Sequence, residues 1–359
     1  MSASALMIAV APSYAVAGNL GAAILVIARV MQGLSVGGEY AASASYLTEV
    51  SASRWRGFGV SFQYVSVTLG QLAGLGMLIG LQLLLDQQQL STWGWRIPFV
   101  AAAIGAIWVF YLRRGMQETT AYRVSRHSTA SDRRGTLAEV WRNRRAVFLV
   151  FALTMGGSVA YYTYTTYLTS YLVNSVGLSP SQASTISFIG LCLFLVMLPL
   201  GGIISDAIGR RPVLMFFGIG TTLGTYPILS GMQRWPTWGI ALALTLLALT
   251  FVTGYSSVNA VVKAELFPTG VRTLGVALPY NIAQAVFGGT AAYIALAFRD
   301  AGYENGFFLY VSGCALVSLV TYALMPETRN RDLIGTTGSA GATTADSTSD
   351  TASLTTERS

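Results

Sequence analysis

Two ionisable side chains, Arg29 and Glu39, lie within one long apolar segment of the sequence. An arginine in the hydrocarbon of a membrane is costly unless it faces a partner or a water-filled cavity. Because a guanidinium can hold a carboxylate through two parallel hydrogen bonds, Arg29 predicts a site for an anionic substrate. Alternatively, the Arg29 side chain extends to the outer membrane surface. A carboxylate inside a protein can bind and release a proton near neutral pH, so Glu39 predicts proton coupling, with a purely structural acid as the alternative.

Polar side chains also gather within other apolar segments. Tyr64, Thr68 and Gln71 fall at i, i+4 and i+7, with Gln63 beside them, so one face of this helix is polar inside the bilayer. A dense run of tyrosines and threonines in a later segment contains residues for the membrane interface and for a cavity. Pro279 is expected to interrupt its helix beside Asn281 and to free backbone groups there. The substrate-binding candidates from these patterns are Arg29, Gln63, Tyr64, Tyr162 and Asn281.

The composition indicates what kind of protein positions these side chains. Of the 359 residues, 53% are hydrophobic and only 10% are charged, and the mean hydropathy is +0.55. Soluble domains carry about 25% charged residues, so a soluble globule is excluded. Apolar runs of about 20 residues recur, and in lipid such runs satisfy their backbone only as helices. The sequence predicts an all-α polytopic membrane protein with nine full spans: Leu20–Leu47, Phe58–Leu85, Trp95–Leu112, Ala146–Val173, Ala183–Ser205, Val213–Met232, Trp238–Val262, Leu274–Phe298 and Gly306–Met325.

The sequence lacks the residue patterns of an enzyme or of an ATP-driven pump. No Ser/His/Asp set, Walker motif or dinucleotide fingerprint is present. The two cysteines, Cys192 and Cys314, lie in apolar runs without metal-ligand spacing, and the single histidine, His127, lies in a polar stretch. We therefore expect no enzymatic activity, no cofactor and no metal site.

The second part of the sequence repeats the first at an offset of 216 residues. Glu49 and Arg56 recur as Glu265 and Arg272 in equivalent turns. Repeats of this kind build many secondary transporters, whose substrate site lies between the halves. The charged loop at Asp206 has no first copy, because its partner at this offset would precede the first residue. We therefore expect that the first half lacks about 70 residues, or two and a half helices.

The predicted spans divide the chain into four parts. Residues 1–112 form an incomplete N-terminal bundle, in which a short apolar remnant precedes three spans. Residues 113–145 form a basic cytoplasmic loop, and residues 146–325 form a C-terminal bundle of six helices. Residues 326–359 are rich in Gly, Ser and Thr and cannot bury a core, so they predict a disordered tail.

Lysine and arginine are distributed unequally between the two sides of the predicted membrane. The connections on one side contain 18 of these residues, and those on the other side contain 3. The positive-inside rule therefore places the basic loop and the C-terminus in the cytoplasm, as in a multi-pass protein of the inner (plasma) membrane. Because topology accounts for the basic loop, no nucleic-acid partner is expected.

Acids accompany the bases at the cytoplasmic ends of the predicted helices. The positive-inside rule explains the arginines but not these acids, so we predict charge networks that close the cytoplasmic face and open as the halves rock. Tyr255, Asn259 and Lys263 form a further polar stripe, with Lys263 at the cytoplasmic mouth. The predicted cytoplasmic gate consists of Glu49, Arg56, Asp206, Arg210, Arg211, Glu265 and Arg272.

Several motifs resemble those of the major facilitator superfamily. They are RVMQGLSVGGEY from residue 29, GGIISDAIGRRP from residue 201, KAELFPTGVR from residue 263 and PETR from residue 326. The strings GGEY, SFQYV, WGWRIPF, WRNRRA and FGGTAAY are further similar to the metabolite:proton symporter family. The likeness extends over about residues 20–325.

The resemblance implies a two-bundle fold of twelve helices, of which this sequence lacks about the first two and a half, and a dicarboxylate such as α-ketoglutarate moving inward with protons. It implies that Arg29 and Gln32 form the arginine motif of the fourth family helix and that Arg96 precedes the sixth. The expected partners are a small organic acid, protons and the lipid bilayer, and the expected state is a monomer. Shikimate, citrate and a proline- or betaine-type osmolyte are alternative cargoes, and a truncated remnant without transport is the alternative to any symporter.

Overall fold

The computed structural model describes residues 2–12, 17–113, 137–267 and 271–329. Every regular element within these ranges is helical, and nine stretches of helix are long and apolar enough to cross a membrane. They correspond one to one with the predicted spans, so the all-α polytopic prediction is confirmed. The nine stretches are Asn19–Val50, Ser53–Leu84, Gly94–Leu112, Arg144–Asn174, Pro180–Ile208, Arg210–Arg234, Trp238–Glu265, Arg272–Asp300 and Glu304–Leu324.

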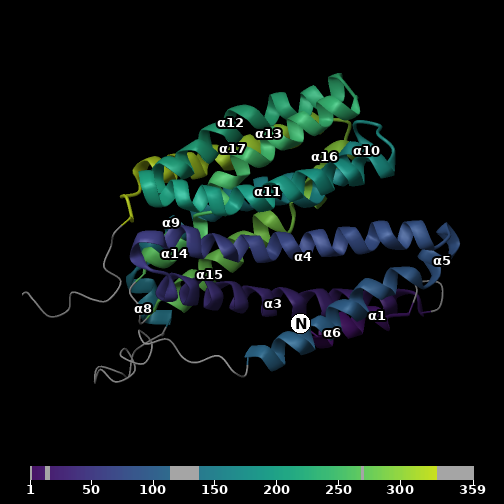
Figure 1. Ribbon diagram of the computed structural model, residues 1–359, viewed down its shortest axis with the longest axis horizontal. Helices are drawn as coiled ribbons and strands as arrows, with labels where there is room; N and C mark the ends of the chain where they lie inside the picture. The colour runs from purple at the N-terminus through teal and green to yellow at the C-terminus, as the bar shows by residue number, and fades with distance from the viewer. Residues whose placement is uncertain (1, 13–16, 114–136, 268–270, 330–359) are drawn as a thin grey trace, which may run out of the picture.

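Helices from the first third of the chain form what we call the first bundle (Figure 1). Helix α1 packs against α3 and α6, and α4 lies beside α3. A capping box between Asp86 and Gln89 begins the short helix α5. The elements are α1 (Ser2–Ala9), α3 (Asn19–Val50), η1 (Ser53–Trp55), α4 (Arg56–Leu84), α5 (Gln87–Thr92), η2 (Gly94–Arg96) and α6 (Ile97–Arg113).

The remaining helices form the second bundle, which contains most of the buried core. Helix α11 begins with a capping box between Ser179 and Gln182 and with Pro180 at its first position, which is a strong start signal. Elements η3 and η4 are π-helical turns. The elements are α8 (Leu137–Arg142), α9 (Arg144–Tyr162), η3 (Thr163–Tyr167), α10 (Leu168–Asn174), α11 (Pro180–Ile208), α12 (Arg210–Arg234), α13 (Trp238–Ser256), α14 (Asn259–Glu265), α15 (Arg272–Ala283), η4 (Gln284–Gly288), α16 (Ala291–Asp300) and α17 (Glu304–Leu324).

Close contact between helix backbones joins α9 to α17 in the second bundle. A Cβ atom at Gly156 would lie 2.4 Å from the carbonyl oxygen of Cys314, so only glycine allows this approach. The Ser318 hydroxyl accepts a hydrogen bond from the Gly156 N–H at 2.9 Å and donates to the Ala152 carbonyl at 2.6 Å. These contacts make α9 and α17 one packed unit.

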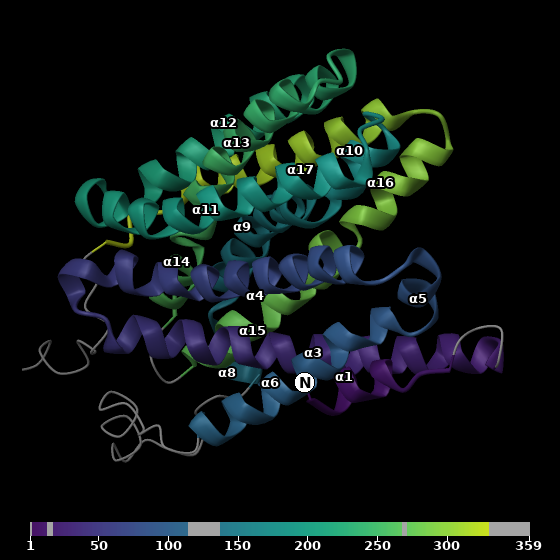
Figure 2. The ribbon, with the colours of Figure 1, turned by 45° about the vertical axis from the view of Figure 1, so that its right-hand side comes forward.

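The two bundles meet along α3 and α4. Figures 1 and 2 both show α4 between α3 and α11, and the contacts between these helices agree with both views. Helix α3 also packs against α14 and α15. Residues far apart in the sequence are thereby brought together at the interface between the bundles.

The prediction that Pro279 interrupts its helix was wrong. Helix α15 continues through Pro279 to Ala283, and the irregular turn is η4, which begins five residues after the proline. In a membrane protein, neighbouring helices and local π-helical adjustments can satisfy the backbone groups that a proline leaves unpaired. The distortion therefore lies after the proline rather than at it.

Candidate functional site

Four charged side chains form two ion pairs between the bundles. Arg272 Nη1 lies 2.8 Å from Glu49 Oε1, and Arg56 Nη1 lies 3.6 Å from Glu265 Oε1. All four side chains are at most 12% exposed, so solvent screens these pairs weakly. We call these four residues the ion-pair layer. Each pair joins the acid of one repeated turn to the base of the other turn, so the two copies exchange partners.

A third acid–base pair binds the second bundle to the start of α4. Asp206 accepts hydrogen bonds from the backbone N–H groups of Gly57 at 2.8 Å and Phe58 at 2.9 Å. Arg210 Nη1 lies 2.7 Å from the same carboxylate. The first N–H groups of a helix are unpaired within it and carry partial positive charge, so the Asp206 carboxylate stabilises this end of α4. We call Asp206, Arg210 and Gly57 the clasp.

The chain turns from α11 into α12 at a single glycine. Gly209 has a φ of 105°, in the left-handed region that favours glycine. Glu327, just beyond α17, accepts hydrogen bonds from the backbone N–H groups of Arg210 at 2.9 Å and Arg211 at 3.0 Å. Burial opposes ionisation of this carboxyl, but backbone N–H groups, which include those of Thr328 and Arg329, outweigh it and hold the pKa of Glu327 below its usual value. Glu327 is therefore an ionised cap on α12.

Replacing Glu327 with glutamine is expected to lower the stability of the chain by about 1 kcal/mol at pH 7, the usual value of a helix cap. A carboxyl whose pKa falls on folding stabilises the protein above its unfolded pKa of about 4.3, and this contribution is lost as the pH falls through the folded pKa. The difference in thermal unfolding midpoint between wild type and Glu327→Gln should therefore shrink from pH 7 towards pH 3. The exposed Asp300→Asn variant is the control, and a difference independent of pH would contradict this role for Glu327.

A lysine whose hydrogen bonds go to neutral oxygens lies beside the ion-pair layer. Lys263 is fully buried on α14, two residues before Glu265. Its Nζ donates to Asn259 Oδ1 at 2.9 Å, to the Tyr255 hydroxyl at 3.1 Å and to the Tyr40 hydroxyl at 3.4 Å. We call this group, together with Tyr280, the lysine cage. The ring centroids of Tyr280, Tyr40 and Tyr255 lie 4.4, 5.2 and 5.3 Å from Nζ.

The predicted charged residues Arg29, Glu39 and Arg96 are not members of the lysine cage, although Glu39 directly precedes Tyr40 on α3. Arg29 is exposed on α3, and its guanidinium donates to Gln32 Oε1 at 3.2 Å. Glu39 is half-buried on the same helix. Arg96 donates to the Ala11 carbonyl at 3.0 Å and lies 4.9 Å from the ring of Trp95. The structure brings Arg29 and Gln32 together, and the roles of all these residues stay predictions.

The predicted polar residues lie at or near the interface between the bundles. Tyr64 is buried and packs edge-on against Tyr161, with 5.3 Å between ring centroids. The Tyr161 hydroxyl donates to Gln71 Oε1 at 3.1 Å, which links α9 to α4. Gln284 donates to the Tyr162 hydroxyl at 3.1 Å. Gln63 and Asn281 are half-buried on α4 and α15.

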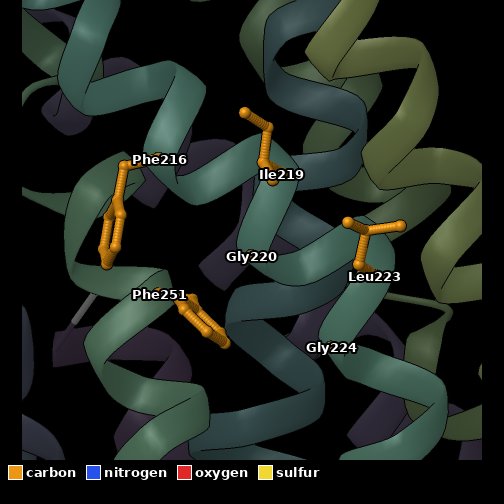
Figure 3. A pocket seen from close by; sticks show the side chains of 6 residues that line it. All are labelled: Phe216, Ile219, Gly220, Leu223, Gly224 and Phe251. Atoms are coloured by element: carbon orange, nitrogen blue, oxygen red, sulfur yellow. The ribbon is translucent and has the colours of Figure 1, made fainter.

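A pocket on α12 and α13 has a different chemistry from these residues (Figure 3). Its side chains are aliphatic or aromatic, and none carries a charge or a hydrogen-bonding group. A carboxylate placed there would lose its hydration without gaining a partner, so the pocket does not suit an organic acid. The lining residues are Phe216, Ile219, Gly220, Leu223, Gly224 and Phe251.

Comparison with known proteins places this arrangement in a family. Residues 1–140 and 125–337 match the family described as sugar (and other) transporter. The α-ketoglutarate permease of Escherichia coli (strain K12) is 41% identical over 325 residues, which cover 90% of this chain and 74% of the permease. The chain belongs to the major facilitator superfamily. The resemblance seen in the motifs is thereby confirmed, and the protein is a multi-pass membrane protein of a transporter family.

Other relatives of the superfamily differ in their cargo. The citrate-proton symporter of Salmonella typhi is 32% identical over 83% of this chain and 68% of the symporter. The proline/betaine transporter of Escherichia coli (strain K12) is 28% identical over 95% of this chain and 70% of the transporter. A solved proton:xylose symporter bound to 6-bromo-6-deoxy-D-glucose has a TM-score of 0.69 at 19% identity, over 93% of this chain and 81% of that chain. This last likeness confirms the two-bundle fold of the superfamily.

Two features of this superfamily member were not among the predicted site residues. In the sequence Lys263 ends a polar stripe, and no pattern there indicates its partner Tyr40. The signal for the cage is the spacing of Tyr255, Asn259 and Lys263 at intervals of four, which places them on one helical face. Glu327 stands out in the sequence only as part of the PETR motif, because a contact with a helix more than 110 residues away leaves no local pattern.

Proposed function

We propose that the chain is a proton-coupled symporter that carries a small organic acid, specifically a dicarboxylate such as α-ketoglutarate, by alternating access. The ion-pair layer is the observation that carries this proposal. Equivalent acids and bases of two repeated turns hold the bundles together, and an interface of separable ion pairs can open while the opposite end closes. The similarity to an α-ketoglutarate permease and to citrate-proton symporters supports the substrate class.

In this proposal three sets of side chains have separate roles. Glu39 exchanges the proton. Arg96, near the end opposite the ion-pair layer, is a further candidate functional residue without an assigned role. The substrate-binding residues are Arg29, Gln32, Gln63, Tyr64, Tyr162 and Asn281. The cytoplasmic gate consists of the ion-pair layer and clasp residues Glu49, Arg56, Asp206, Arg210, Glu265 and Arg272, together with Arg211.

The proposal also fixes an orientation. The gate and the C-terminus face the cytoplasm, and the protein lies in the inner membrane as a monomer without a cofactor or nucleic-acid partner. Residues 1–112 and 146–325 act as the two rocking bodies, residues 113–145 connect them, and residues 326–359 form a cytoplasmic tail. The excess of Lys and Arg on one side of the spans supports this orientation.

Uptake of radiolabelled α-ketoglutarate into proteoliposomes tests the proposed function. With one proton per substrate, an interior more alkaline by 2 pH units should sustain up to about 100-fold accumulation, because each pH unit is worth about 1.36 kcal/mol. A protonophore should abolish this accumulation. Uptake indifferent to the gradient would contradict proton coupling. Stronger competition by citrate, shikimate, proline or betaine than by unlabelled α-ketoglutarate would contradict the proposed cargo.

The Glu39→Gln variant separates coupling from binding in the same assay. A glutamine keeps the shape and hydrogen-bonding capacity of the side chain but cannot bind and release a proton. Exchange of labelled for unlabelled substrate should therefore survive better than gradient-driven accumulation. Loss of both activities together would indicate a structural acid instead.

A further inference from the structure

Lys263 differs from the other buried cations near the ion-pair layer. Arg56, Arg210 and Arg272 each form an ion pair with an acidic side chain. Within the described ranges of the chain, the hydrogen bonds of Lys263 Nζ go only to neutral oxygens of tyrosine and asparagine, and no carboxylate forms an ion pair with it. Among the described residues, the lysine cage therefore surrounds the Lys263 ammonium with neutral groups and without an ion-paired acid.

The cage offsets only part of the cost of burying this charge. Removing an ammonium group from water is expensive, and an acid at close range is the usual compensation in proteins. Hydrogen bonds to neutral oxygens and the faces of three aromatic rings provide weaker compensation. The Asn259 amide oxygen accepts hydrogen bonds from both Lys263 and the Tyr40 hydroxyl, the latter at 2.6 Å, so it is not available to Lys263 alone. An anion that reached Lys263 would be bound in preference to these groups.

The cage is assembled from both bundles. Tyr40 comes from α3 in the first bundle, whereas Tyr255, Asn259 and Tyr280 come from the second bundle. The rings of Tyr40 and Tyr280 stack across the interface with 3.8 Å between centroids. Separation of the bundles at the ion-pair layer would remove Tyr40 and leave Lys263 with an open position. The cage can thus close over the ammonium in one conformation and admit a ligand in the other.

The remaining part of the cage is held in place by its own bundle. A Cβ atom at Gly157 of α9 would lie 2.2 Å from the ring of Tyr255, so this ring rests directly on the α9 backbone. Asn259 donates to the Tyr255 carbonyl at 3.1 Å. Lys263 therefore keeps two positioned neighbours when Tyr40 departs, which favours a site that exists before the anion arrives.

We infer that Lys263 binds a carboxylate of the cargo on the cytoplasmic side of the transport path, and that Tyr40 takes the place of that carboxylate when the bundles are closed. This inference rests on the proposed function. Tyr40 lies eleven residues beyond Arg29 on α3, or about 16 Å along the helix axis. The carboxyl groups of a five-carbon dicarboxylate are only about 5 Å apart. Lys263 is therefore a second station on the path rather than a partner of Arg29 for the same molecule.

The test compares three acids by calorimetry with the purified full chain. α-Ketoglutarate has both carboxylates, whereas 2-oxopentanoate and 4-oxopentanoate each replace one of them with a methyl group. Lys263→Met keeps the length of the side chain and removes its charge. The dissociation constant for α-ketoglutarate should rise about 10- to 100-fold, since hydrogen bonds to charged groups are the stronger ones. For the analogue that lacks the carboxylate held by Lys263, the dissociation constant should change less than about 3-fold between the wild type and Lys263→Met.

The outcomes separate this inference from the proposed function. If the unaltered chain binds and accumulates α-ketoglutarate but Lys263→Met weakens all three acids equally or none of them, the inference is overturned and the proposed function stands. If the unaltered chain neither binds nor accumulates it, both fail. Lys263→Arg, which keeps the charge, should retain more affinity than Lys263→Met, and equal losses in the two variants would also overturn the inference.

Chemical rescue addresses a Lys263→Met protein that fails to fold. In a background with Cys192→Ser and Cys314→Ala, Lys263→Cys is modified with aminoethyl methanethiosulfonate, which rebuilds an ammonium, or with propyl methanethiosulfonate, which is similar in length and neutral. Mass spectrometry confirms complete labelling. Only the ammonium should restore binding of α-ketoglutarate. Equal restoration by both reagents, or by neither, would show that the charge of Lys263 does not bind the cargo.

Discussion

Reversing the charge of Arg272 is expected to abolish uptake, and reversing Glu49 in the same chain is expected to restore part of it. The two side chains lie 2.8 Å apart and are 1% and 12% exposed. Removing one partner of a buried pair costs about 3–5 kcal/mol, because the other charge stays buried. Arg272→Glu should therefore reduce the population of the closed conformation by more than about 100-fold.

The double variant Glu49→Arg with Arg272→Glu exchanges the two charges and keeps them adjacent. We expect it to recover at least about a tenth of the wild-type uptake rate. Recovery stays incomplete because the exchanged charges also act on the second ion pair of the layer, Arg56 with Glu265. The exposed pair of Arg299 and Asp300, 3.2 Å apart, is the matched control, because reversal of a surface pair costs at most about 1 kcal/mol. A double variant no more active than Arg272→Glu alone would show that this contact does not govern transport.

Gly57→Val is expected to reduce uptake about 5- to 150-fold without unfolding the chain. A Cβ atom at Gly57 would lie 2.5 Å from Arg210 Nη1 and from Ser205 Oγ and 2.8 Å from the Gly202 carbonyl oxygen. These atoms surround Gly57 where the start of α4 crosses α11. Overpacking of this kind costs about 1–3 kcal/mol. A cost of this size shifts an equilibrium between two conformations of the bundles by about 5- to 150-fold.

Gly313→Val provides the control for Gly57→Val. Gly313 lies on an exposed face of α17, where an added Cβ atom meets nothing within 4 Å. Uptake rates and thermal unfolding midpoints should be measured for both variants. We expect Gly313→Val to match the wild type in both measurements and Gly57→Val to lose uptake while its midpoint stays within a few degrees. Wild-type uptake by Gly57→Val would rule out a requirement for this close crossing.

The sequence was sufficient to predict the spans, but it did not indicate which charged residues pair with one another. Apolar length alone identifies a membrane helix, so all nine spans were found. The repeat identified Glu49 and Arg272 as equivalent in kind to Glu265 and Arg56. It did not indicate that each acid pairs with the base of the other copy, because that contact depends on how the bundles meet. The Asp206 contact with Gly57 was missed for the same reason, since backbone N–H groups carry no sequence signal.

The position of the irregular backbone also could not be predicted from the sequence. The distortion expected at Pro279 lies at η4 instead, because the surrounding helices decide which backbone groups can be left unpaired. Lys263 was visible as a polar residue on a helical face, but its full burial depends on Tyr40, which lies 223 positions away. Contacts between distant segments therefore set the chemistry of this lysine.

The exchange of partners in the ion-pair layer has an evolutionary consequence. A two-fold axis between identical subunits makes residue i of one contact residue j of the other, and j contact i. Two separate copies of one ancestral half, related by such an axis, would have formed both pairs from a single acid and a single base. Gene duplication and fusion would then have preserved a dimer contact that already existed, with no new interaction to be invented.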